Sequence, residues 1–349
     1  MMTEVYKVID NKIDTDDMRN AVEAIRNGGL VAFPTETVYG LGGDATNPMA
    51  SKKIYAAKGR PSDNPLIVHI AYFSQLEDIV SEVPEAARAL ADKFWPGPLT
   101  MILNKNDKIP YETTGGLDTV AIRMPNHPVA LQFLQESMCM IAAPSANTSG
   151  RPSPTTAAHV YDDLNGKIDV ILDGGPVGIG IESTIVDLSE DIPTILRPGY
   201  ITQEMLSEVI GPVRMDPGLT SENVNVRPKA PGMRYRHYAP QAELTFIEGD
   251  NETVVAKINE LTKEASEAGQ KVGIISTQEN KGSYVGGEVI CIGSKDDEEE
   301  IARHLYKVLR DFDDSDVDVI YSEGFESAGI GGAIMNRLIK AAGHRIIEV

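Results

Sequence analysis

Two cations flank one glycine in the segment KGRPSDNPLIVHI, residues 58–70. Lys58 and Arg60 are followed by Pro61 and Pro65, which restrict the loop. Because a stiff loop loses less conformational entropy on binding than a flexible one, this spacing favours an anionic ligand. The alternative is a lysine that ends a helix and a solvated arginine. The two cations are therefore candidates for an anion site.

Hydroxyl residues alternate in FPTETVYGLGGDA, residues 33–45. In an extended chain Thr35 and Thr37 share one face, and Glu36 lies on the other. The segment is predicted to connect a strand to a glycine-rich bend, and solvated threonines in a turn are the alternative. Its GLGG run has the wrong spacing for a Rossmann or P-loop fingerprint.

A histidine and an arginine lie in apolar runs. His69 belongs to LIVHI, where Ile67 shares its face, so it is either a core histidine or a substrate contact. Arg123 belongs to TVAIRMP, and burying a guanidinium is costly without an anionic partner. That partner is either a carboxylate of the chain or the carboxylate of a ligand.

A loop rich in hydroxyl and amide groups follows an apolar run in APSANTSGRPSP, residues 143–154. It offers Ser145, Asn147 and Ser153, while Ser183 and Arg197 lie at strand ends further on. A surface loop has this composition, and so does a nucleotide-binding loop. No Ser/His/Asp set, zinc-type spacing or carboxylate pair can be argued from the sequence. Cations, hydroxyls and rigid loops suit a nucleoside triphosphate, for which catalysis is chiefly positioning and electrostatics.

Predicted strands with few helices between them must position these residues. A helix is predicted at 18–27, a strand at 30–34, and further strands in LIVHIA, TMILN, TVAIRMP, MIAAPSAN, DVILDGG, STIVDLS and TILRPG. Helical spacing occurs near 48–57, 84–93, 127–137 and 155–164. This pattern favours an open, mixed α+β sheet over residues 1–212.

The pattern changes in residues 242–349. The strands ELTFIEG, KVGIIST, EVICIGS and VDVIYSEG alternate with helical segments, which predicts a smaller, parallel α/β domain of Rossmann-like type. It lacks a G-x-G-x-x-G turn, so a regulatory role and a ligand site are both open for it. Residues 213–241 are rich in Pro, Gly and Asn, which predicts a linker.

The charge balance separates the linker from both domains. The formal net charge of the 349 residues is -20, and the pI is about 4.7. Residues 1–212 hold 16 Lys+Arg against 28 Asp+Glu, whereas residues 213–241 hold 5 against 2. We therefore expect no direct tRNA binding and no membrane surface, and the linker suits a strap over a bound polyanion. Cys139 and Cys291 lack metal or redox spacing, and no signal core or long apolar run occurs, which predicts a cytoplasmic protein.

Seven motifs occur in one order: PTETVYGLG, KGRPSDNPLIVHI, WPGPLT, VAIRMPNHP, APSANTSGRPSPT, STIVD and LRPG. Together they resemble the YrdC-like domain of threonylcarbamoyl-AMP synthases, and PGMRYRHYAP with the domain after it resembles the long form of that family. The resemblance implies an L-threonylcarbamoyladenylate synthase. Such a nucleotidyltransferase converts L-threonine, bicarbonate or CO2, and ATP to threonylcarbamoyl-AMP and pyrophosphate. Its product serves the threonylcarbamoyladenosine modification of tRNA, with transient contact to the transferase machinery.

The resemblance also implies roles for individual residues. Lys58 and Arg60 are the expected catalytic residues, which offset charge on the phosphates together with Mg2+. The expected ATP contacts are Arg60, Asn64, Thr119, Ser145, Asn147, Ser153, Arg197, His237 and Tyr238. The expected L-threonine contacts are Thr35, Thr37, His69, Arg123, Ala143 and Ser183. The linker is expected to cover the active site, and the threonine carboxylate is expected to pair with Arg123.

Two other functions compete with this one. A nucleic-acid-binding module could present the same concave domain, but the acidic balance of residues 1–212 argues against it. A carbamoyl-transferring maturation factor contains a similar domain together with Cys-rich zinc motifs. Two isolated cysteines exclude such motifs here.

Overall fold

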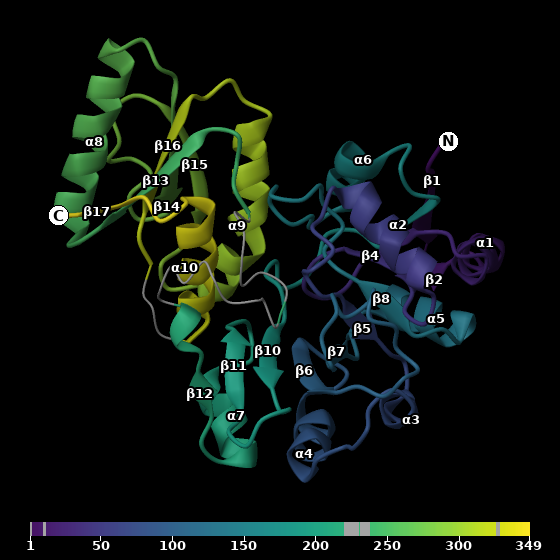
Figure 1. Ribbon diagram of the computed structural model, residues 1–349. Coiled ribbons are helices and arrows are strands. Elements are labelled where there is room, and N and C mark those ends of the chain that lie inside the picture. The colour runs from purple at the N-terminus through teal and green to yellow at the C-terminus, as the bar shows by residue number, and fades with distance from the viewer. Residues whose placement is uncertain (1, 10–11, 220–229, 231–237, 326–328) are drawn as a thin grey trace. The chain divides into compact units, whose positions relative to one another are not determined.

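The computed structural model describes residues 2–9, 12–219, 230, 238–325 and 329–349. The chain forms two compact units, whose elements are labelled in Figure 1. The first comprises Met1–Ser149, Ser153–Gly178 and Glu182–Arg234. The second comprises Gly150–Pro152, Ile179–Ile181 and Tyr235–Val349. The predicted linker, residues 213–241, spans the boundary between Arg234 and Tyr235.

Twelve described strands of the first unit form one sheet, in the order β12-β11-β10-β6-β7-β5-β8-β4-β3-β9-β1-β2. The sheet contains parallel pairs, such as β5 with β7, and antiparallel pairs, such as β6 with β7, which confirms the predicted mixed sheet. The strands are β1 (Glu4–Ile9), β2 (Lys12–Ile13), β3 (Val31–Phe33), β4 (Gly40–Asp44), β5 (Ile67–His69), β6 (Leu99–Asn104), β7 (Thr119–Arg123), β8 (Ile141–Ala143), β9 (Val170–Asp173), β10 (Thr184–Asp187), β11 (Thr194–Arg197) and β12 (Arg214–Met215).

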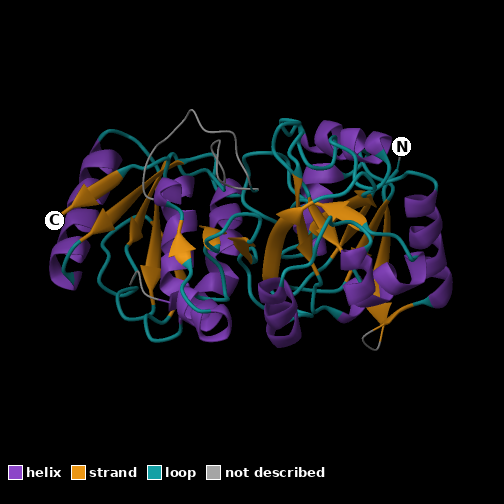
Figure 2. Cartoon of the chain, turned by 60° about the horizontal axis from the view of Figure 1, so that its bottom comes forward, coloured by secondary structure: helices purple, strands orange, loops and turns teal. Residues whose placement is uncertain are grey.

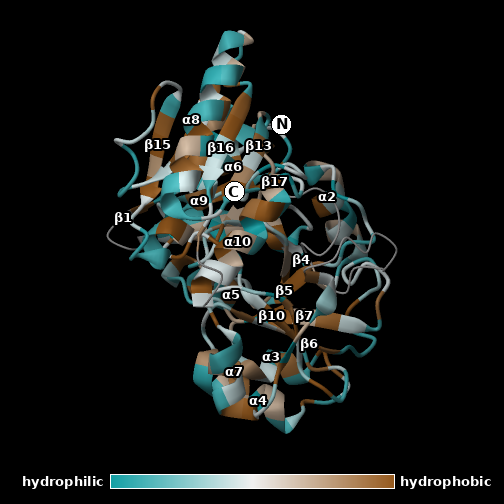
Figure 3. Ribbon diagram, turned by 90° about the vertical axis from the view of Figure 1, so that its left-hand side faces the viewer, coloured by the Kyte–Doolittle hydropathy of each residue, from teal (hydrophilic) through white to brown (hydrophobic). Residues whose placement is uncertain are grey.

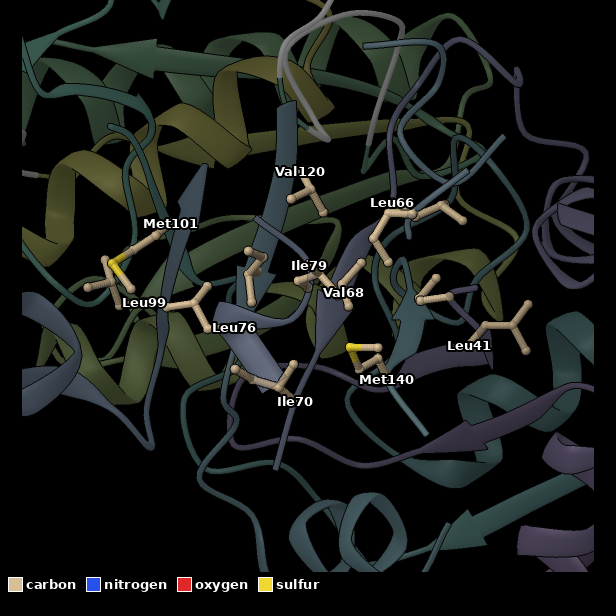
Figure 4. Packing of buried hydrophobic residues seen from close by; sticks show 14 of the residues in the cluster. Leu41, Leu66, Val68, Ile70, Leu76, Ile79, Leu99, Met101, Val120 and Met140 are labelled. Atoms are coloured by element: carbon tan, nitrogen blue, oxygen red, sulfur yellow. The ribbon is translucent and has the colours of Figure 1, made fainter. Parts of the chain in front are cut away.

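The helices of this unit pack on two sides of the sheet. They are α1 (Thr15–Arg26), α2 (Pro48–Lys58), α3 (Phe73–Glu77), α4 (Glu85–Phe94), α5 (Pro128–Ser137), α6 (Ala157–Leu164) and α7 (Gln203–Ile210). Phe33 packs with α1 and α5, whereas its neighbour Ala32 packs in the cluster that α2, α3, α4, α6 and α7 share. Figure 4 shows Val68 and Met101 in that second cluster. Strand residues therefore alternate between two cores, as the pleat requires.

A third, small cluster lies on the face of β5 opposite to the one from which Val68 projects. It consists of Ile67, Ile102, Ala121, Ile185, Leu196 and Ala230. It contains residues of strands and Ala230, which belongs to the predicted linker, and no residue of a described helix. This part of the sheet surface, around β5, β7, β6 and β10, is where the candidate site lies.

The segment predicted as a glycine-rich bend is a strand. Strand β4 pairs antiparallel with β3 and with β8. A Cβ on Gly42 would lie 2.7 Å from Ile141 Cγ2 and 3.0 Å from Phe33 Cε1. The glycines are therefore needed because neighbouring side chains pack onto the strand, and the chain does not bend there.

The second unit has a parallel sheet, in the order β15-β14-β16-β13-β17. Helix α8 covers one face, and α9 and α10 lie together on the other (Figure 1). The elements are β13 (Glu243–Glu248), α8 (Asn251–Glu267), β14 (Val272–Thr277), β15 (Glu288–Gly293), α9 (Glu298–Asp313), β16 (Val319–Glu323), α10 (Gly329–Ala341) and β17 (Ile346–Glu348). The predicted parallel α/β domain is confirmed.

Figure 2 shows that each unit combines strands with helices. Figure 3 shows hydrophobic colour on strands of both sheets and hydrophilic colour along much of α8. Two short segments belong to the second unit although their neighbours in sequence belong to the first. Arg310 donates to Pro152 O (2.6 Å), and Ala239 N donates to Gly150 O (3.0 Å). Among the described residues, every helix is too short or too polar to cross a membrane.

Candidate functional site

Strand register aligns three polar side chains in one row. His69 of β5 lies opposite Arg123 of β7, and Arg123 lies opposite Thr100 of β6. Residues directly opposite in adjacent strands project from the same face. All three are at least 95% buried, and they lie on the face that carries the apolar side chains Ile67 and Ala121. The sheet therefore gathers residues from distant parts of the sequence into a polar row.

Arg123 is held by three groups of the chain. Its Nη1 donates to Thr37 Oγ1 (2.8 Å), its Nη2 to Glu36 Oε1 (2.5 Å) and its Nε to Gly97 O (3.3 Å). The two threonine hydroxyls lie 2.9 Å apart, and Thr35 donates to Val38 O (2.6 Å). Of the two partners left open by the sequence, the carboxylate of the chain is the one in place.

The expected orientation of Glu36 is wrong. Glu36 reaches Arg123 on the same side as Thr37, although strand alternation predicts opposite faces. The reason is local, because residues 34–39 form a turn in which the two-residue period of a strand does not hold. Glu36 was not predicted as a site residue, and the one signal for it in the sequence is its place between two candidate threonines.

His69 is a neutral group. Its Nδ1 lies 3.2 Å from Ile67 O, and its ring meets Phe33 edge-on at 5.7 Å. Burial, and then the nearby Arg123 cation, lower its pKa to about 3. His69 can therefore donate or accept a hydrogen bond near neutral pH, but it does not carry a positive charge there.

The row continues into β10 and β11. Ser183 Oγ lies 2.8 Å from Thr100 Oγ1, a residue that sequence analysis did not select. Arg197 donates from Nε to Ser183 O (3.0 Å) and from Nη2 to Ser183 Oγ (3.1 Å). Thr100, Ser183 and Arg197 thus form one hydrogen-bonded group on the sheet face.

Lys58 ties helix α2 to the hydroxyl-rich loop. Its Nζ donates to Ser145 O (2.5 Å) and to Asn147 O, and its own carbonyl accepts from Ser149 N (2.8 Å). Within the loop, Ser145 Oγ donates to Asn147 Oδ1 (2.6 Å). Gly59 ends the helix with a φ of 62° and turns the chain toward Arg60. The Lys-x-Arg and Ser-x-Asn segments therefore form one connected structure.

Asn64 carries a buried acceptor that no described residue pairs with. The residue is 1% exposed, and its Oδ1 has no hydrogen-bond partner among the described residues. Arg60 donates to Pro65 O (3.2 Å) and to Asn64 O (3.4 Å), which holds the loop around it. A buried acceptor without a donor is costly, so a ligand donor at Asn64 is favoured.

Register places two further candidates on the same face, displaced from the row along the strands. Thr119 and Ser145 lie two residues beyond Ala121 and Ala143, the β7 and β8 partners of Ile67, and away from His69. At about 3.3 Å per residue, they are roughly 13 Å along the strands from the Arg123 level. The candidate amino-acid contacts and nucleotide contacts therefore occupy successive parts of one face.

The remaining candidates lie in different surroundings. Ser153 is fully buried and donates to Glu182 Oε1 (2.6 Å), another residue that sequence analysis missed. Tyr238 belongs to the second unit, where its ring stacks on Tyr306 at 5.2 Å. His237 lies outside the described residues. No cluster of three or more His, Cys, Asp or Glu that suits a metal occurs in the part of the chain that the structure describes.

A sheet face with cations, hydroxyls and a buried arginine, followed by a parallel α/β unit, defines a two-part class of proteins. A family model described as telomere recombination matches residues 23–199, and one described as threonylcarbamoyl-AMP synthase, C-terminal domain, matches residues 201–343. The chain belongs to the threonylcarbamoyl-AMP synthase family.

Two relatives and one solved structure show the extent of the similarity. The threonylcarbamoyl-AMP synthase of Pyrococcus abyssi is 52% identical over 348 residues and is covered over its full length, as is this chain. That of Bacillus subtilis is 51% identical over 343 residues, with 97% of each chain covered. The structure of Pyrococcus abyssi Sua5 complexed with L-threonine is 50% identical, has a TM-score of 0.93 and covers 100% of both chains.

Proposed function

We propose that this chain is an L-threonylcarbamoyladenylate synthase and, by reaction class, a nucleotidyltransferase. The L-threonine amine adds to CO2, supplied directly or from bicarbonate, and loses a proton to give a carbamate. A carbamate oxygen then attacks the α-phosphorus of ATP, and the bond from that phosphorus to the pyrophosphate oxygen breaks. The products are threonylcarbamoyl-AMP, which serves tRNA threonylcarbamoyladenosine modification, and pyrophosphate.

The polar row is the proposed L-threonine site. Arg123 pairs with the carboxylate of L-threonine, and the neutral His69 and the Ser183 hydroxyl supply hydrogen bonds without adding charge. Thr35 and Thr37 support the arginine, and the backbone at Ala143 closes the side next to β5. The buried guanidinium in a chain of this family is the observation that carries the proposal.

The end of the face near the hydroxyl-rich loop is the proposed ATP site. Arg60 stabilises the charge that develops on the phosphates. Lys58 acts on the phosphates through the loop, because its ammonium donates hydrogen bonds to the carbonyl groups of Ser145 and Asn147. The other proposed contacts are Asn64, Thr119, Ser145, Asn147, Ser153, Arg197, His237 and Tyr238, the last two from the linker that we expect to cover the site.

Mg2+ fits this site as a companion of ATP. The polar side chains near the hydroxyl-rich loop include a cation, hydroxyls and an amide. Among the described residues, no group of three or more His, Cys, Asp or Glu could hold a metal ion by itself. Mg2+ is commonly held through substrate phosphates and water, and there it supplies charge neutralisation. We expect transient contact with the tRNA threonylcarbamoyl-transferase machinery, no direct tRNA binding because of the net charge of -20, and a cytoplasmic location.

Pyrophosphate release from ATP tests this proposal. We expect release that requires L-threonine and bicarbonate together, and we expect Arg123→Ala to weaken L-threonine binding at least tenfold in calorimetry. The arginine change removes the cation that lies opposite His69 and Thr100 in the polar row. Release at the same rate without L-threonine would overturn the proposed reaction.

A further inference from the structure

Glu36 is a largely buried carboxylate, with a side chain that is 13% exposed, to which the reaction assigns no role. Its Oε1 accepts from Arg123 Nη2 (2.5 Å), and its Oε2 accepts from the backbone N of Asn126 (2.9 Å). The side chains of Arg123 and Glu36 are only 4% and 13% exposed. One carboxylate thus joins the turn after β3 to the arginine of β7 and to the backbone just beyond that strand.

The contacts of Arg123 leave room for a second carboxylate. A guanidinium has five N–H donors. Gly97 O, Thr37 Oγ1 and Glu36 Oε1 each accept one of them, which leaves one donor on each terminal nitrogen in this structure. A carboxylate that binds an arginine in bidentate geometry takes two donors from adjacent nitrogens. One remaining donor on each of the two terminal nitrogens is the number that such a carboxylate needs.

Glu36 therefore acts on Arg123 in two opposite ways. As an acceptor it fixes one terminal nitrogen, so the guanidinium does not have to be ordered when a ligand arrives. As an anion it already neutralises the guanidinium, so it competes with the charge of an incoming carboxylate. The first effect strengthens ligand binding and the second weakens it.

We propose that Glu36 is a positioning residue that sets the orientation and the residual charge of Arg123, and thereby the affinity of the site for the carboxylate of an amino acid. This inference rests on the proposed function, in which Arg123 binds L-threonine. Glu36 itself makes no bond to the substrate in this account. We expect Glu36 to affect the binding of L-threonine and not the binding of ATP.

Two substitutions separate the two effects. Glu36→Gln keeps a carbonyl oxygen for Arg123 Nη2 but removes the charge and the acceptor of Asn126 N, whereas Glu36→Ala removes all three. Glu77→Gln is the matched control, because Glu77 also pairs with an arginine, Arg88 (2.9 Å), but on the surface, with a side chain that is 48% exposed. Calorimetric titration of L-threonine into each full-length protein, without ATP, gives the affinities.

The expected order is specific. Glu36→Gln binds L-threonine at least as tightly as the original chain, Glu36→Ala binds at least tenfold more weakly, and Glu77→Gln is unchanged. In the pyrophosphate assay, Glu36→Ala raises the KM for L-threonine while the KM for ATP changes less than twofold. A purely structural role would alter both KM values or the folded fraction instead.

Three results would overturn the inference. They are equal losses in Glu36→Gln and Glu36→Ala, no loss in Glu36→Ala, or an equal rise in both KM values. If Glu36→Ala does not fold, Glu36→Asp replaces it, because the shorter carboxylate keeps the charge but loses the reach, and unchanged affinity would then count against the proposal. If the unaltered chain binds no L-threonine, the proposed function itself fails, so the two failures are distinguished.

Discussion

His69 shows at the scale of one residue how burial decides what a side chain can do. A histidine near a reacting amine suggests a general base, but its pKa of about 3 makes it a weak base. The cause is removal from water, followed by repulsion from Arg123. Its place in the row therefore suits hydrogen bonding to a charged substrate, and the positive charge of the row comes from the arginine.

The lowered pKa predicts a pH-dependent stability. Between pH 6.5 and the folded pKa, the unfolded chain binds a proton at His69 that the folded chain does not. Stability contributed by this group is therefore lost as pH falls, by about 2 kcal/mol between pH 6.5 and pH 5. Urea denaturation at both pH values should show that His69→Gln loses less stability than the unaltered chain. Equal losses would contradict the assignment.

At the scale of elements, long-range pairing explains which parts of the site the sequence could predict. Apolar runs predicted β5, β6, β7 and β10, because a buried strand has a local signature. Strand β4 was missed, because its glycines resemble a bend until Phe33 and Ile141 are packed against them. The Glu36–Arg123 pair was missed because 87 residues separate the partners and only the sheet register brings them together.

The tie between α2 and the hydroxyl-rich loop predicts a stability effect at the same scale. Lys58→Met leaves the carbonyl groups of Ser145 and Asn147 buried without the ammonium donor. We expect a loss of about 1–3 kcal/mol in the free energy of unfolding, together with loss of pyrophosphate release. Lys52→Met is the control, since Lys52 lies on the same helix but its side chain is 56% exposed, and its stability should change by less than about 0.5 kcal/mol. Equal effects of the two changes would contradict the tie.

At the scale of the whole molecule, charge and fold point to small anionic substrates rather than to a nucleic acid. The chain has a net charge of -20, yet it buries Lys58, Arg60, Arg123 and Arg197 in the first unit. Such local cations can hold a nucleotide and an amino acid while the surface repels a nucleic acid backbone. The second unit has a parallel sheet with helices on both faces, as its alternation of strands and helices predicts.

Mass spectrometry of the product tests the central claim most directly. The chain is incubated with ATP, Mg2+, L-threonine and bicarbonate labelled with 13C. The account predicts an adduct of threonine, one labelled carbon and AMP, formed in equal amount with pyrophosphate and absent when L-threonine is left out. AMP and pyrophosphate without the labelled adduct, or an adduct without the label, would contradict the account.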